Sequence, residues 1–143
     1  MEENTEKLLE EIDLGCHMAK NSFDQIRQYE MSGKLAKLLN KYEKKHEEIR
    51  KEAAEQLHQC GRQEKKPHPV TEAMSWITTE MKMLRKDNDT QIAKLMMNGC
   101  NMGIQSISEK INNLPGAAKE AVTLGEKLIK VEEEFMAEMK SFL

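Results

Sequence analysis

The stretch 35–57, LAKLLNKYEKKHEEIRKEAAEQL, decides the fold of this chain. Its apolar residues recur at steps of three or four, the spacing that places side chains on one face of an α-helix. The positions on this face are Leu35, Leu39, Tyr42, His46, Ile49, Ala53 and Leu57. His46 falls in the middle of the face, and Glu43 lies at its margin three residues earlier. The stretch therefore predicts a long helix that buries one face and carries a Glu and a His close together near its centre.

The composition around this stretch predicts an all-α fold. The chain has 143 residues, which fits one domain over residues 1–143, and it contains only three prolines, seven glycines and 4% aromatic residues. Its 22 Lys and Arg and its 25 Asp and Glu alternate along the predicted helices, as on solvated helix faces. The net charge of −3 argues against a nucleic-acid partner.

We expect a cytoplasmic protein that does not bind membranes. No apolar run approaches the roughly 18 residues that span a bilayer, and the acidic start Met1-Glu2-Glu3 is unlike a secretory signal. The three cysteines are an odd number without close spacing, which suits a reducing compartment better than a disulfide framework or a zinc knuckle.

Apolar periodicity predicts three further long helices and one short one. We expect the long helices near 4–31, 33–60, 88–113 and 117–142, and the short one near 70–86. Thr5 is the expected N-cap of the first helix, and Ser32 can cap the second. The short helix would cross from the second long helix to the third and would carry an apolar strip of Trp76, Ile77, Met81 and Leu84. Because exposed apolar strips usually mark contacts, we expect a homodimer formed through this crossover helix, and a protein partner is the alternative.

The two halves of the chain resemble each other, as in an internal duplication. The segment 14–23 aligns without gaps on 98–107, at a separation of 84 residues, with Gly, Cys, Met and Ser in matching places. The second helix aligns on the fourth at a separation of 89, which sets Glu43 on Glu132 and His46 on Phe135. A register shifted by one residue would instead pair them with Glu133 and Met136. We prefer the first register because it keeps one apolar face on the other.

Two copies of a helical hairpin joined by a crossover resemble a ferritin-like four-helix bundle. The resemblance rests on Glu43-x-x-His46, on the residues 76–89 around the crossover, on the segment 99–107 and on the segment 130–136. It places the chain among the small ferritin-like proteins of uncharacterised function. The expected fold is thus an all-α, ferritin-like bundle of two helical hairpins with a short crossover helix.

The resemblance implies a metal site that this chain keeps only in part. Metal-binding relatives use a Glu-x-x-His unit on each of two helices and one carboxylate on each of the other two. Here Glu43, His46 and Glu132 match, whereas Phe135 stands where the second His would be. The positions where the relatives have their lone carboxylates fall, in this chain, at or beside Cys16 and Cys100. We therefore predict a degenerate site without a di-iron centre, in which the remaining candidate ligands are Glu43, His46, Glu132, Cys16 and Cys100.

Each of these residues also has a purely structural interpretation. Cys16 and Cys100 can be small buried hydrophobes that face each other, or they can join His46 and a carboxylate in a softer site for zinc or copper(I). His46 can be a core histidine bonded to Glu132 or Glu43, or it can be a ligand. Two hypotheses about function therefore remain. In the first, the protein is a non-enzymatic bundle that acts by association and needs no cofactor. In the second, it is a metal-binding or redox-active protein with an altered site for zinc, copper or iron.

Overall fold

A computed structural model describes residues 2–61 and 89–143 as four long helices and one short 3₁₀ turn. The long helices are α1 (Glu2–Ile26), α2 (Gly33–Gln59), α4 (Asp89–Asn113) and α5 (Lys119–Met139), and the turn is η1 (Lys140–Phe142). The described residues contain no strand, so the prediction of an all-α four-helix bundle is confirmed. The crossover helix expected at 70–86 lies outside the described residues.

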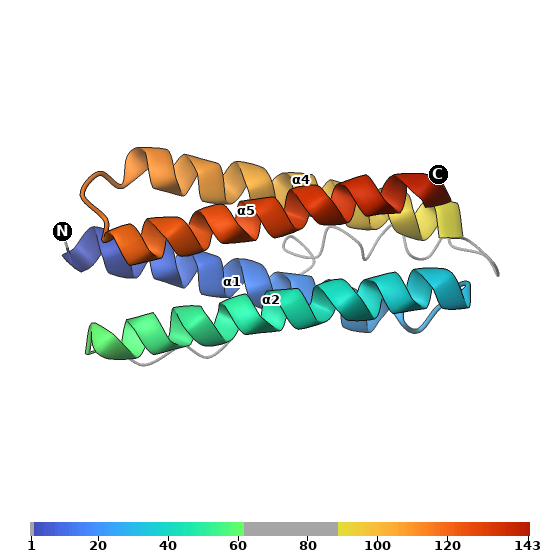
Figure 1. The fold of residues 1–143 in the computed structure, drawn as a ribbon, viewed down its shortest axis with the longest axis horizontal. Coiled ribbons are helices and arrows are strands. Elements are labelled where there is room, and N and C mark those ends of the chain that lie inside the picture. Colours follow the sequence, from blue (N-terminus) through green and yellow to red (C-terminus); the bar gives the residue numbers. More distant parts are fainter. Residues whose placement is uncertain (1, 62–88) are drawn as a thin grey trace.

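The four helices pack as two antiparallel hairpins laid against each other (Figure 1). The first hairpin is α1 with α2, and the second is α4 with α5. Each helix also packs on a helix of the other hairpin, α1 on α4 and α2 on α5. In Figure 1, α2 and α4 run in one direction while α1 and α5 run in the other. Residues on α2 and α5 therefore meet across the boundary between the hairpins.

The core lies along the predicted apolar faces. All seven positions of the stretch 35–57 that were assigned to one face are buried. On α5 the buried positions are Ala121, Leu124, Gly125, Leu128, Val131, Glu132, Phe135 and Met139. Glu133 is exposed and Met136 is only partly buried. This burial pattern agrees with the register that sets His46 on Phe135.

The first helix is shorter than its predicted span, because it ends at Ile26 rather than near residue 31. Beyond Ile26 the amides of Gln28 and Tyr29 donate to carbonyls three residues earlier, at 3.3 and 3.0 Å. Such bonds tighten the last turn of a helix and end it. The other predicted boundaries lie within three residues of the observed ones. Ser32 caps α2 as predicted, since its hydroxyl accepts a hydrogen bond from the Leu35 amide at 3.1 Å.

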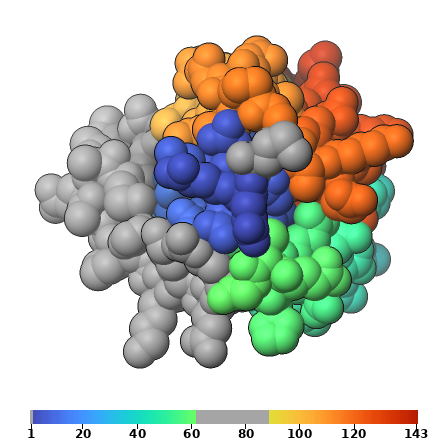
Figure 2. Space-filling view, turned by 90° about the vertical axis from the view of Figure 1, so that its left-hand side faces the viewer, coloured from blue at the N-terminus to red at the C-terminus, as the bar shows by residue number. Residues whose placement is uncertain are grey.

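Thr5 was predicted to cap α1, and this prediction is wrong because α1 begins at Glu2. The buried Thr5 hydroxyl instead accepts a hydrogen bond from the amide of Ala118 at 2.8 Å, at the start of α5. Ala118 makes no cap with its own side chain. Next to this bond, the Asn4 side chain donates to the Pro115 carbonyl at 2.8 Å. Figure 2 shows this end of the molecule, where the first residues of α1 lie against the turn between α4 and α5.

We expect Thr5→Val to lower the free energy of unfolding by about 1–2 kcal/mol. Valine keeps the shape of threonine but leaves the Ala118 amide without its acceptor. Urea denaturation of both proteins measures this difference. Thr90→Val is the matched control, because the exposed Thr90 hydroxyl donates to the Phe142 carbonyl at 2.8 Å where water can replace it. Equal losses in the two variants would contradict the capping role of Thr5.

Candidate functional site

The centre of the bundle holds a buried pair formed by His46 of α2 and Glu132 of α5. His46 is 3% exposed and Glu132 is 7% exposed. The imidazole Nε2 contacts Glu132 Oε1, and Nδ1 lies 2.7 Å from the backbone carbonyl oxygen of Tyr42. A carbonyl oxygen can only accept, so Nδ1 carries a hydrogen. Both ring nitrogens of His46 are therefore engaged inside the protein. Of the two expected partners, Glu132 and Glu43, the structure bonds His46 to Glu132.

The contact with Glu132 favours the protonated form of His46. Burial disfavours the imidazolium, but the charge of Glu132, its hydrogen bond and the Tyr42 carbonyl outweigh burial. The pKa of His46 is raised above its ordinary value as a result. A buried charge is tolerated when it is paired and hydrogen-bonded. The two side chains therefore neutralise each other in the core.

Both predicted cysteines are buried near this pair. Burial raises the pKa of Cys16 and of Cys100, and the negative charge of Glu132 raises both pKa values further. The Cys100 thiol also donates a hydrogen bond to Glu132. Both side chains are consequently neutral thiols at neutral pH, whereas metal binding and nucleophilic attack need the thiolate.

Glu43 lies apart from the buried pair. Its Oε1 lies 2.5 Å from Nη2 of Arg27, in the turn after α1, and its side chain is 26% exposed. Glu43 lines a hollow of about 260 Å³ between α1 and α2, together with His46 and Cys16. The structure thus gathers Glu132 with His46 and Cys100, whereas Glu43 lies at the edge of the bundle.

Within residues 2–61 and 89–143 no group of three or more His, Cys, Asp and Glu side chains is arranged to hold a metal ion. Phe135 lies in the space between the helices at the level of His46. Its ring stacks on Tyr42 at 4.5 Å and on Phe23 at 5.8 Å between centroids, and it meets the His46 ring edge-on at 6.5 Å. The prediction of Cys16, Cys100, His46, Glu43 and Glu132 as ligands remains a prediction.

Three polar contacts around the site were not predicted from the sequence. Nε2 of His17 lies 3.4 Å from Oδ1 of the buried Asp13, one turn earlier on α1. Their separation of four residues is a signal that could have revealed this pair. The Tyr42 hydroxyl binds Glu138 of α5, and a buried tyrosine generally requires such a partner. The contact between Arg27 and Glu43 has no comparable signal, because the two residues lie on different elements.

Gly103 of α4 provides the space that the Glu132 carboxylate occupies. A Cβ atom at position 103 would lie 3.1 Å from Glu132 Oε2, whereas one at Gly15 would meet only Leu128 Cδ2 at 3.8 Å. We expect Gly103→Ala to lower the free energy of unfolding by about 1–3 kcal/mol, because the added methyl group would push the Glu132 carboxylate away from its position against His46. Gly15→Ala should instead raise it by about 0.5–1 kcal/mol through helix propensity.

Thermal and urea denaturation of the two alanine variants measure these opposite effects. A Gly103→Ala variant as stable as Gly15→Ala would show that Glu132 can move without cost.

The chain matches no protein-family model, no curated protein and no solved structure with which it was compared. The helices that the structure describes include none with an apolar stretch long enough to cross a membrane.

Proposed function

We propose that this protein is a non-enzymatic, ferritin-like bundle that acts by association with a second copy of itself or with a protein partner. The arrangement of two antiparallel hairpins with α2 parallel to α4 supports the ferritin-like assignment. His46 and Glu132 lie buried on facing helices, and metal-binding bundles build their sites from side chains on facing helices. In this proposal the pair is a vestige of such a site.

The observation that carries the proposal is that both ring nitrogens of His46 already have a hydrogen-bond partner within the protein. One ring nitrogen binds the Tyr42 carbonyl and the other binds Glu132, so neither offers a lone pair to an ion. The neighbouring Cys16 and Cys100 are neutral thiols because burial raises their pKa. These groups stabilise one another instead of presenting a reactive atom.

Elemental analysis of untagged protein purified without chelator tests the non-metal part of the proposal. We expect less than about 0.1 equivalent of iron, zinc or copper per chain, both in the native protein and in His46→Ala, because both ring nitrogens of His46 are engaged and both buried thiols are protonated. Two iron atoms per chain that are lost in His46→Ala would overturn it. One zinc or copper per chain, lost in Cys100→Ala, would favour the alternative function of a metal-binding or redox-active protein.

The proximity of both thiols to Glu132 favours that alternative. The Cys100 thiol donates a hydrogen bond to Glu132, and the negative charge of Glu132 also raises the pKa of Cys16. If a soft ion such as zinc or copper(I) displaced the thiol protons and the Nε2 proton of His46, these side chains would become one imidazole, one carboxylate and two thiolate ligands.

Light scattering tests the association part. Among the described residues the large exposed apolar side chains are Met102 and Leu143, so the expected dimer contact falls on the crossover residues Trp76 and Ile77, outside the described residues. We expect a mass near twice the 16.5 kDa of one chain at micromolar concentration. Ile77→Glu should reduce the mass to that of a monomer, whereas Glu133→Lys on the exposed face of α5 should not. A monomeric native protein would contradict the homodimer and leave a separate partner as the associating molecule.

A further inference from the structure

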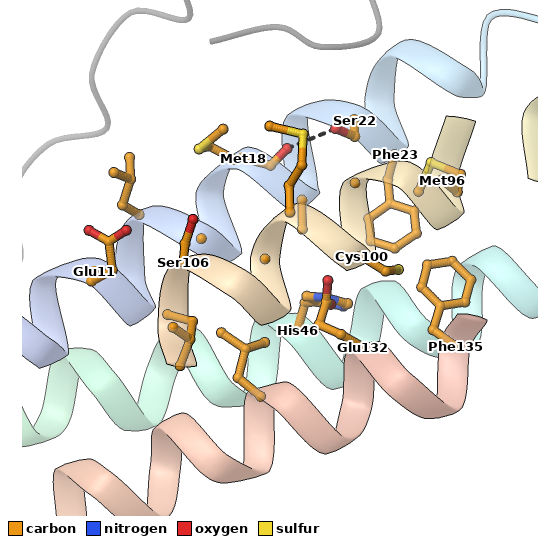
Figure 3. A pocket seen from close by; sticks show the side chains of 18 residues that line it. Glu11, Met18, Ser22, Phe23, His46, Met96, Cys100, Ser106, Glu132 and Phe135 are labelled. Atoms are coloured by element: carbon orange, nitrogen blue, oxygen red, sulfur yellow. Dashed lines mark hydrogen bonds and ion pairs between the residues drawn. The ribbon is translucent and has the colours of Figure 1, made fainter. Parts of the chain in front are cut away.

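A pocket with about 100 Å³ of open space lies between α1 and α4, with the buried pair at its base (Figure 3). Space remains between the two helices because small residues occupy the facing positions of both. These residues are Gly15, Ala19 and Ser22 on α1 and Gly99, Gly103 and Ser106 on α4. Each residue of the first set lies 84 positions before its counterpart in the second, the separation found for the repeated segments 14–23 and 98–107. The two halves of the chain thus build the two walls of the pocket symmetrically.

The base of the pocket is not symmetric, because it carries polar groups from the other two helices. His46 of α2 and Glu132 of α5 both line it, together with Cys100. Oε1 of Glu132 binds His46, while Oε2 faces Gly103 on the pocket wall. A carboxylate oxygen accepts more than one hydrogen bond, and the thiol that bonds to Glu132 is a weak donor. Glu132 therefore retains the capacity to accept a stronger hydrogen bond from a molecule in the pocket.

Apart from the Glu11 carboxylate and the hydroxyls of Ser22 and Ser106, the remaining lining is apolar and adaptable. Phe23, Leu128 and Phe135 provide rigid apolar surface, and Met18, Met96 and Met102 provide flexible thioether side chains. Methionine adapts its shape to different partners. Pockets that combine apolar walls with a few convergent polar groups are the usual form of small-molecule sites.

We propose that this pocket binds a small, neutral, mainly apolar molecule that donates one hydrogen bond, from a hydroxyl or an N–H group, to Glu132. This inference is independent of whether the bundle forms dimers.

Charge selects the neutral donor among the candidate head groups. An anionic head would face the Glu132 carboxylate and be repelled. An ammonium head would add a second buried positive charge to a carboxylate that His46 already neutralises. A hydroxyl makes a charge-assisted hydrogen bond with no change in net charge, and such bonds are stronger than those between neutral groups.

Size selects a short molecule. An engineered apolar cavity of about 150 Å³ binds benzene, so the present pocket should hold a body of about four to six non-hydrogen atoms. Such small ligands bind in the millimolar range unless their contacts are nearly ideal.

Methyl NMR of the full-length protein with ¹³C-labelled methionines tests the proposal. The probes are 1-butanol, its isomer diethyl ether, butylamine and butyrate, which share a four-carbon composition but differ in donor and charge. We expect 1-butanol to shift the methyl signals of Met18 and Met96 saturably at millimolar concentration. Each of the other three probes should bind at least about fivefold more weakly, since each lacks the neutral donor. Equal affinity for 1-butanol and diethyl ether, or no saturable shift with 1-butanol, would overturn the proposal.

Variants that fill the pocket without touching the buried pair show where the probe binds. Ala19→Leu on α1 and Ser106→Leu on α4 should each weaken 1-butanol binding at least about tenfold, because the added side chain takes up the ligand's space. Ala54→Leu, a partly buried position of α2 outside the pocket lining, is the matched control and should leave binding unchanged. Unchanged binding in both filled variants would place the site elsewhere and overturn the assignment. Since Ser106 is exposed, its variant remains informative if Ala19→Leu fails to fold.

Discussion

His46→Leu is expected to lower the free energy of unfolding by about 3–5 kcal/mol, the size typical for loss of one member of a buried ion pair. The substitution removes the imidazole from a buried pair and leaves the Glu132 carboxylate in the core without its main partner. Urea denaturation at neutral pH measures this loss.

The double variant His46→Leu with Glu132→Leu should recover most of this loss. It removes both charges together, and an apolar pair of similar volume generally replaces a buried ion pair without large cost. The difference between single and double variants is the coupling between the two residues. Arg27→Leu provides the control, because its contact with Glu43 is partly exposed and should be worth about 1 kcal/mol or less. A His46→Leu variant no less stable than Arg27→Leu would contradict the importance of the buried pair.

The second large effect is a loss of stability at alkaline pH. The pKa values of Cys16 and Cys100 are raised in the folded protein, mainly by burial and then by Glu132. The unfolded thiols ionise near their ordinary pKa of about 8.5. Between that pH and the raised values the folded state binds more protons than the unfolded state, so stability falls as pH rises. Each thiol should contribute a slope of about 1.4 kcal/mol per pH unit.

Stability curves between about pH 8.5 and 10 in the presence of a reductant measure this slope. The double variant Cys16→Ala with Cys100→Ala should flatten the curve, by about half of the full effect near pH 8.5 and by close to about 2.7 kcal/mol per pH unit near pH 10. Cys60→Ala is the control, because Cys60 is only half-buried and should change the slope less. Equal slopes for the native protein and the double variant would contradict neutral buried thiols. His46 acts in the same direction from about pH 6.5 upward, because its raised pKa also favours the folded state at lower pH.

The periodicity of apolar residues was sufficient to predict the bundle. The predicted face of α2 is buried at each position, because an amphipathic helix of this length has only one way to cover its apolar side. The ends of the helices were less predictable. The bond from Ala118 to Thr5 joins residues more than a hundred positions apart, and no local pattern encodes such a partner.

The site was predictable in its members but not in its geometry. Spacing placed both His46 and Glu132 on apolar faces, and burial then required each to find a partner. The same spacing placed Glu43 beside them, but Arg27 holds its carboxylate at the edge of the bundle. That choice depends on where the end of α1 lies relative to α2, which a pattern on a single helix does not determine.

The placement of His46 and Glu132 on different hairpins has a consequence for the folding rate. The α1–α2 and α4–α5 hairpins have local contacts and can form early, whereas the two charges meet only when α2 docks on α5. Both groups must shed water in that step, before their mutual attraction is complete. We therefore expect the double variant His46→Leu with Glu132→Leu to refold faster than the native protein in stopped-flow experiments. Faster refolding of this variant would show that the buried pair slows the docking of the two hairpins.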